Sequence, residues 1–255
     1  MKSLLDATAP YIHRFRGIRI STRPDCIDED ILALLRSYKV TSIELGAQSM
    51  SDDVLSANGR GHTALDVERA SALIKNMGFE LGLQMMTGLY KSSDELDRYT
   101  AERFIALRPA AVRIYPTIVM RGTRLGELYQ SGLYEPQKLD DAVDLCAGLI
   151  TRFELNGIRV IRVGLHDTDT LRRDMLAGPY HPAFRELCES RIMLDKAIYL
   201  LSVTDKGEKT LRVSAKCRSK MTGNKKSNIA ALNKLGYDIR IIEDDTVPDM
   251  DIVIS

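Results

Sequence analysis

Polar side chains stand at or near the carboxyl ends of four short segments that read as β-strands. The segments are residues 18–21, 41–45, 79–86 and 112–115. The polar side chains, one for each segment in order, are Ser21, Gln48, Gln84 and Tyr115. In parallel α/β folds the carboxyl ends of the strands meet at one edge, where ligands bind. One such side chain would be a turn residue that satisfies its own backbone, but four in register favour a shared polar ligand site.

An arginine between two glycines follows the second of these segments, in the stretch Gly59-Arg60-Gly61. A guanidinium in a mobile backbone is a bidentate donor that suits a carboxylate or a phosphate. The alternative is a solvated loop. Glu44 lies within the second segment, and a buried carboxylate needs a partner. We expect an ion pair from Glu44 to Arg19 or Arg113 on neighbouring strands.

Helices are expected between these strands, because apolar residues recur at helical spacing there. The expected helices are residues 28–38, 63–77, 93–107 and 139–155, with a long irregular connection over 116–136 and a further strand over 158–163. Single strands alternating with helices predict a parallel sheet with right-handed crossovers. The last part of the chain mixes short strands and helices, so we expect domains of residues 1–195 and 196–255.

Basic residues concentrate between Lys206 and Lys234, where Glu208 is the sole acid. A basic stripe can hold an RNA backbone, and the alternative is a solvated face. The residues that we expect to contact RNA are Lys216, Arg218, Lys220, Lys225 and Lys226.

The whole 255-residue chain carries a net charge of only +1, which argues against a polyanion-binding surface over the entire molecule. No apolar run approaches the roughly 18 residues that span a bilayer, and no secretory signal is apparent. The four cysteines are far apart in sequence and form neither a disulfide framework nor a metal knuckle. These features predict a cytoplasmic protein without a membrane segment.

Four ordered segments resemble the radical S-adenosylmethionine (SAM) superfamily, in the branch of the Elongator catalytic subunit and oxygen-independent coproporphyrinogen oxidase. They are GIRISTRPD (17–25), IELGAQS (43–49) with GRGHT (59–63), LGLQMMTGL (81–89) and VRIYPTIVMRGTRLGELY (112–129). The likeness is greatest to bacterial members that carry a small C-terminal domain in place of an acetyltransferase domain. It implies an incomplete parallel (β/α)6 barrel, a partial TIM barrel, with a small C-terminal α+β appendage.

The resemblance also implies two cofactors, SAM and a 4Fe–4S cluster that reduces it to a 5′-deoxyadenosyl radical. Carried over by motif, Ser21 and Gln84 fall near the ribose of SAM, and Gln48 near the ribose or the methionine part. Arg60 pairs with the methionine carboxylate. Met86 and Tyr115 line the nucleoside pocket.

The family holds its cluster through CxxxCxxC, and this sequence has no such motif. A thiolate-bound cluster cannot be built from isolated cysteines unless the fold gathers them, so we assign no metal ligand. The first two strands of the barrel also have no counterpart. We therefore expect an exposed sheet edge, which is completed by another segment or self-associates.

The leading interpretation is a radical SAM enzyme of unknown substrate, with tRNA as a candidate, that is inactive as this chain alone. The alternative is a non-catalytic remnant or split partner that binds nucleotide or RNA. A third reading, an unrelated barrel lyase or aldolase, is weakened because no Schiff-base lysine or histidine pair stands at the strand ends.

Overall fold

The computed structural model describes residues 2–255, which divide into two compact units. The N-terminal unit comprises residues up to Lys138 together with Arg152–Pro179, and the C-terminal unit comprises Leu139–Thr151 and Tyr180–Ser255. Helix α7 (Leu139–Leu155) belongs to both units, and α9 (Phe184–Leu201) is continuous across residue 195. The domain division at residues 195 and 196 stays a prediction.

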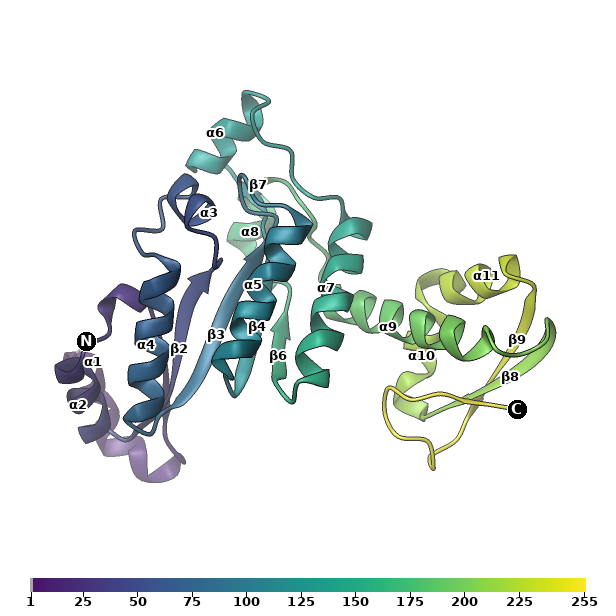
Figure 1. Ribbon diagram of the computed structural model, residues 1–255, viewed down its shortest axis with the longest axis horizontal. Helices are drawn as coiled ribbons and strands as arrows, with labels where there is room; N and C mark the ends of the chain where they lie inside the picture. The colour runs from purple at the N-terminus through teal and green to yellow at the C-terminus, as the bar shows by residue number, and fades with distance from the viewer. Residues whose placement is uncertain (1) are drawn as a thin grey trace. The chain divides into compact units, whose positions relative to one another are not determined.

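A five-stranded parallel sheet forms the centre of the N-terminal unit (Figure 1). Its order is β1-β2-β3-β4-β6, with bounds Ile18–Thr22, Val40–Gln48, Glu80–Thr87, Ala111–Pro116 and Arg159–Val163. The predicted α/β class with a parallel sheet is therefore confirmed. Among the described strands, β1 pairs only with β2, so its other side is an edge of the sheet.

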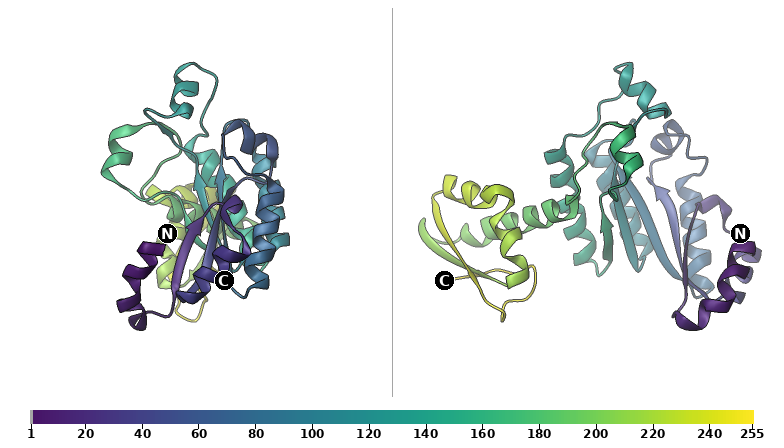
Figure 2. Two further views of the ribbon diagram at one scale, coloured as in Figure 1. Left: turned by 90° about the vertical axis from the view of Figure 1, so that its left-hand side faces the viewer. Right: turned by 180° about the vertical axis from the view of Figure 1, so that it is seen from behind.

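Helices α2 (Glu29–Ser37), α4 (Ala64–Asn76) and α5 (Asp94–Leu107) connect these strands. Each begins after a side-chain cap, from Asp28, Thr63 and Ser93 respectively. The Thr63 cap is a complete capping box with Asp66, in which two otherwise unpaired donors of the first turn are satisfied. Helices α4 and α5 lie against one face of the sheet, as Figure 1 shows. The opposite face is seen in the right-hand panel of Figure 2.

The segment after β4 contains regular structure, so the expectation of an irregular connection over 116–136 was wrong. It holds the two-residue strand β5 (Val119–Met120) and helix α6 (Arg124–Gln130), which Thr123 caps. β5 pairs with β7 (Met175–Ala177), which follows α8 (Asp169–Asp174). A small cluster around Val119 and Tyr134 buries the apolar residues of this segment, which its glycines made hard to recognise.

The C-terminal unit holds a three-stranded sheet of order β10-β8-β9. Its strands are β8 (Gly207–Val213), β9 (Tyr237–Glu243) and β10 (Val253–Ile254), and β8 runs parallel to β9. Helices α10 (Arg218–Thr222) and α11 (Ser227–Lys234) lie between β8 and β9 in the chain. The core of this unit includes Met193, Leu201 and Met221. The predicted small C-terminal α+β sheet is present.

None of the described helices is long and apolar enough to cross a membrane. The short helix α1 (Lys2–Thr8) and helix α3 (Asp52–Ala57) complete the N-terminal unit.

Candidate functional site

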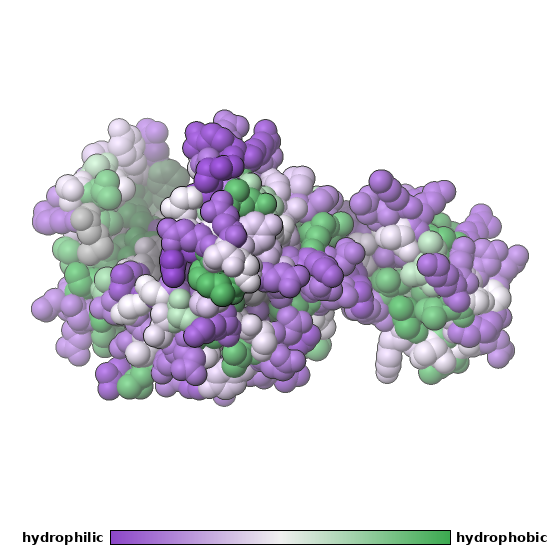
Figure 3. Space-filling model, turned by 90° about the horizontal axis from the view of Figure 1, so that it is seen from above, coloured by the Kyte–Doolittle hydropathy of each residue, from purple (hydrophilic) through white to green (hydrophobic). Residues whose placement is uncertain are grey.

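One face of the parallel sheet carries most of the predicted polar residues. Side chains alternate between the two faces of a strand, and the registers place Ser21 opposite Glu44, Gln84 opposite Arg113, and Met86 opposite Tyr115. The alternate residues of β3, such as Leu83 and Met85, are fully buried. The view from above in Figure 3 shows hydrophilic side chains prevailing on the N-terminal unit, with hydrophobic residues deeper in a hollow.

Glu44 and Arg113 form an ion pair across this face. Arg113 Nε lies 2.8 Å from Glu44 Oε2, and the Ser21 hydroxyl donates to Glu44 Oε1 at 3.2 Å. Glu44 is only 2% exposed, so its charge depends on these partners. The strand between them contributes Gly82, where an added Cβ would lie 3.4 Å from Glu44 Cβ and Cγ. The expected ion pair of Glu44 is confirmed, with Arg113 as the partner.

Gln48 ends β2 in a left-handed backbone conformation, with φ of +65°. The residue is 8% exposed and follows a register shift between Leu45 and Gln48. Gln84 Nε2 donates to Gln48 Oε1 at 3.4 Å, so two of the predicted site residues are in contact. A Cβ at Gly46 would lie 2.8 Å from Gln48 Nε2. A non-glycine residue held at positive φ marks a place where the surrounding structure fixes a side chain against its backbone preference.

Arg60 reaches Met86 from the loop after α3. Its Nη2 donates to Met86 Sδ at 3.0 Å, a weak acceptor for a charged donor. Arg60 Nε is buried and has no hydrogen-bond partner among residues 2–255, and burial lowers the pKa of Arg60 below its ordinary value. A half-buried guanidinium without a carboxylate partner fits an anionic ligand group, because pairing would repay its lost hydration.

Contacts therefore join the predicted residues in separate groups: Ser21 with Glu44, Gln48 with Gln84, and Arg60 with Met86. Tyr115 accepts a hydrogen bond from Arg113 at 3.5 Å. His62 is buried, and its Nε2 lies 3.0 Å from the carbonyl oxygen of Ala47. This contact ties the loop of Arg60 to the end of β2, a role for His62 that the sequence did not reveal.

A buried aspartate, which sequence reasoning missed, fixes the loop after β3. Asp97 is 1% exposed and accepts hydrogen bonds from Gly88 N at 2.8 Å and Ser92 Oγ at 2.7 Å. Burial raises the pKa of Asp97 to about 6. The Tyr134 hydroxyl donates to Gly88 O at 2.6 Å. The available signal was an acidic residue four positions after the Ser93 cap, on the side of α5 that faces inward.

The cysteines of the described residues do not gather into a cluster site. Cys26 is exposed, while Cys146, Cys188 and Cys217 are buried, and all four are free. A hydrogen bond to Cys146 and burial raise the pKa of Cys188, which disfavours the thiolate that iron requires. Residues 2–255 contain no group of three or more His, Cys, Asp or Glu side chains that could hold a metal ion. The residues present thus do not fit a 4Fe–4S cluster.

The parallel sheet with a polar inner face defines the N-terminal unit as part of a β/α barrel. Residues 4–102 match the model of the radical SAM superfamily, and residues 109–194 match the Radical_SAM C-terminal domain. The chain belongs to the radical SAM superfamily. SAM and a 4Fe–4S cluster are the cofactors that this family implies.

Two curated relatives are Elongator complex protein 3 of Dictyostelium discoideum and that of Homo sapiens. They are 34% and 35% identical over 179 residues, which is 69% of this chain but 31% and 32% of those proteins. The chain thus spans about a third of the length of these relatives. Among solved structures, the archaeal Elp3 of Methanocaldococcus infernus with an N-terminal deletion gives a TM-score of 0.63 at 24% identity. That match covers 74% of this chain and 43% of the archaeal chain, and it supports the fold.

Proposed function

We propose that the polar face of the N-terminal unit binds SAM for a radical SAM enzyme that modifies tRNA. Arg60 would pair with the methionine carboxylate, and Gln48 and Gln84 would hold the ribose together with Ser21. Met86 and Tyr115 would line the nucleoside pocket. The observation that carries this proposal is the half-buried Arg60. Within the part of the chain that the structure describes, its Nε has no hydrogen-bond partner, and its Nη2 donates to the sulfur of Met86.

Ser21 is the weakest member of this set. The Ser21 hydroxyl already donates to Glu44. A ribose hydroxyl would either displace that hydrogen bond or donate to the Ser21 oxygen as a second contact. Gln84, in contrast, makes a single long hydrogen bond to Gln48 and can exchange it for a ribose hydroxyl at little cost. We therefore expect Gln84 to contribute more to nucleoside binding than Ser21.

The 4Fe–4S cluster, when bound in this family, supplies the electron that cleaves SAM. We propose that this chain alone does not carry out that cleavage, because its 255 residues contain no CxxxCxxC and residues 2–255 hold no cluster ligand set. The cluster ligands would come from polypeptide outside this sequence. The edge of β1 is the place where a completing segment would add to the sheet, or where two copies would associate.

Transfer RNA is the proposed substrate because a curated relative from Methanocaldococcus jannaschii, 31% identical over 136 residues, is named tRNA uridine(34) acetyltransferase. Lys216, Arg218, Lys220, Lys225 and Lys226 are the proposed RNA contacts in the C-terminal unit. We place this activity in the cytoplasm, as the sequence predicted.

Ligand binding to the R60A variant tests the role of Arg60. We compare SAM with methylthioadenosine, which keeps the nucleoside but lacks the methionine carboxylate, by isothermal titration calorimetry. The R60A variant should bind SAM at least about 10-fold more weakly, since a charge-assisted bidentate contact contributes 1.5–3 kcal/mol, and should bind methylthioadenosine unchanged. The Q84A variant should weaken both ligands.

The matched control is R124A, which removes an exposed arginine of α6 whose partner is Glu127. This variant should bind both ligands like the unmodified protein. Equal affinity of R60A and R124A for SAM would remove Arg60 from the site. Loss of both ligands in R60A would mean that Arg60 supports the pocket and does not contact the carboxylate.

The alternative function is that of a non-catalytic partner that binds nucleotide or RNA, and the scattered cysteines favour it. Anaerobic reconstitution with iron and sulfide, followed by assay for 5′-deoxyadenosine, separates the two. Both readings predict no stoichiometric 4Fe–4S absorbance in this chain alone. The enzyme reading further predicts 5′-deoxyadenosine once the cluster-bearing polypeptide is added, whereas a non-catalytic partner would give none.

A further inference from the structure

The loop that joins α10 to α11 has a backbone that only particular residues can adopt. It comprises Gly223, Asn224, Lys225 and Lys226, and three of the four have positive φ: +78° at Gly223, +50° at Lys225 and +63° at Lys226. A Cβ at Gly223 would lie 2.4 Å from Ser227 Oγ and 2.7 Å from Asn228 N, so the close approach of the backbone there requires glycine.

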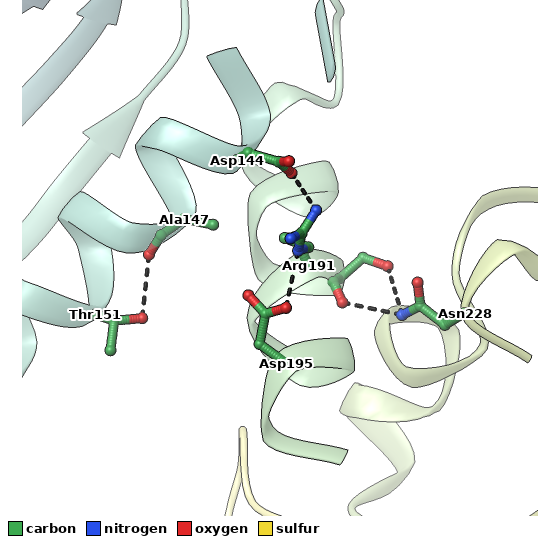
Figure 4. Close-up of polar contacts among 7 residues, drawn as sticks. Asp144, Ala147, Thr151, Arg191, Asp195 and Asn228 are labelled. Carbon is green, nitrogen blue, oxygen red and sulfur yellow. Dashed lines mark hydrogen bonds and ion pairs between the residues drawn. The ribbon is translucent and has the colours of Figure 1, made fainter. Parts of the chain in front are cut away.

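Asn228, in the first turn of α11, makes the hydrogen bonds that fix the end of this loop. It is 4% exposed, and its Nδ2 donates to Ser190 O at 2.9 Å, to Ser190 Oγ at 3.1 Å and to Lys220 O at 3.0 Å. The first turn of α11, directly after the loop, is therefore tied to both α9 and α10. Figure 4 shows the Asn228 amide directed at these acceptors on α9. A loop held in one conformation loses little conformational entropy when a ligand binds to it.

A cleft of about 340 Å³ lies beside the loop, within the C-terminal unit. Its lining includes Ser219, Lys220, Asn224 and Lys225 from the loop and α10, with His181 and Glu186 from the segment around the start of α9. These side chains supply ammonium, hydroxyl, amide and imidazole groups beside the single carboxylate of Glu186. That set suits the phosphates, hydroxyls and base edges of a nucleic acid strand.

Of the five cations predicted to contact RNA, the two without an ion pair among residues 2–255 both lie on the loop. Lys216 pairs with Asp249, Arg218 with Glu243, and Lys220 with Glu189. These ion pairs neutralise three of the five cations predicted to contact RNA.

Lys225 and Lys226, in contrast, are exposed and have no ion pair within residues 2–255. A second cleft, which shares His181 and Asn224 with the first, is lined by Asp140 and Asp144, the latter paired with Arg191 (Figure 4). Because the unpaired Lys225 lines the first cleft, we place the nucleic acid strand along that cleft.

The chain order around the loop resembles that of a known RNA-binding module. Two parallel strands, β8 and β9, flank two helices that a short loop beginning with glycine connects. In KH modules a GXXG loop clamps the backbone of four nucleotides of a single strand. Here the four positions read Gly223-Asn224-Lys225-Lys226, and Lys226 adopts at the fourth position the left-handed conformation that glycine prefers.

We propose that the loop of residues 223–226 and its cleft form a binding site for single-stranded RNA. The loop backbone and the two lysines hold successive phosphates, and the cleft takes the nucleotide between them. This site deepens the RNA contact of the proposed function, on which it rests, and it does not depend on SAM binding.

Fluorescence anisotropy of the full chain with a labelled mixed-sequence RNA decamer tests the site over a salt series. The double variant K225E/K226E should weaken binding at least about 10-fold and lower the salt slope by more than 1, since each lost phosphate contact removes about 0.7 from the slope for a single strand. The control K209E/K234E makes the same change of charge on β8 and α11 and should lose less than about 3-fold. Single-stranded RNA should bind more tightly than the RNA duplex or the DNA decamer of the same sequence.

A second variant, K225G/K226G, separates binding from folding. Glycine relieves the strain of positive φ, so this variant should melt at or above the temperature of the unmodified protein and still lose affinity. Equal losses in the loop and control variants, or tighter binding of duplex or DNA, would overturn the proposal, as would absence of RNA binding. SAM affinity of both loop variants should be unchanged, so failure of SAM binding with RNA binding intact would reject the SAM site alone.

Discussion

The buried carboxyl of Asp97 should make the stability of the protein depend on pH, and the D97N variant isolates that effect. Asp97 is 1% exposed, and burial raises its pKa from 3.8 to about 6 despite the hydrogen bonds from Ser92 and Gly88. The protonated form is therefore favoured by folding. A rise of this size corresponds to about 3 kcal/mol, at 1.36 kcal/mol for each pKa unit. Because the folded-state pKa is the higher one, this contribution is complete below pH 3.8 and is lost as the pH rises through about 6.

Asparagine is neutral at every pH and can accept from Gly88 N with its oxygen while donating to Ser92 Oγ. Urea unfolding of both proteins between pH 4 and pH 7.5 gives the difference in their unfolding free energies. We expect D97N to gain about 2.4 kcal/mol relative to the unmodified protein over that range, because the unfolded carboxyl is already mostly ionised at pH 4. The D53N variant, which replaces an exposed carboxylate at the start of α3, should show no comparable trend.

A constant difference between D97N and the unmodified protein across that range would refute the argument. It would mean that the hydrogen bonds from Gly88 and Ser92 offset burial in full and that Asp97 is ionised in the folded protein at pH 5. A gain in D53N equal to that in D97N would assign the trend to net charge.

Two further substitutions test the packing of polar groups. R113A should lower the unfolding free energy by about 3–5 kcal/mol, because it leaves the buried charge of Glu44 without its cation. The double variant R113A/E44L should recover most of that loss. Urea titration measures both. N228A should lower the unfolding free energy by about 1–3 kcal/mol, because the carbonyls of Ser190 and Lys220 lose a donor. Hydrogen exchange should quicken in α11 and change little in the N-terminal unit. Unchanged exchange in α11 would contradict this role of Asn228.

Local signals in the sequence predicted the regular elements well. The helices expected over residues 63–77 and 93–107 are α4 and α5, which begin directly after their caps Thr63 and Ser93. Helix α6 was missed because its seven residues follow a glycine-containing turn and contain Gly126, which weakens any helical pattern. Its burial comes from contacts with residues on both sides of it in the chain, such as Val119 and Tyr134, which periodicity within the helix cannot reveal.

The candidate site was less predictable than the fold. The Glu44 ion pair was expected, because a carboxylate inside a strand needs a partner. The left-handed backbone of Gln48 and the burial of Asp97 depend on tertiary packing, which no local rule anticipates. Likewise, the acids that neutralise Lys216 and Arg218 lie 33 and 25 residues further along the chain.

The central claim is that the polar face of the parallel sheet binds SAM, and methionine-methyl NMR tests it most directly. In protein labelled with ¹³C-methyl methionine, titration with SAM should shift the Met86 resonance, assigned through an M86L variant. The resonance of Met221, buried in the core of the C-terminal unit, should stay in place. A titration that leaves Met86 unmoved while SAM binds, or that shifts Met221 alone, would contradict the account.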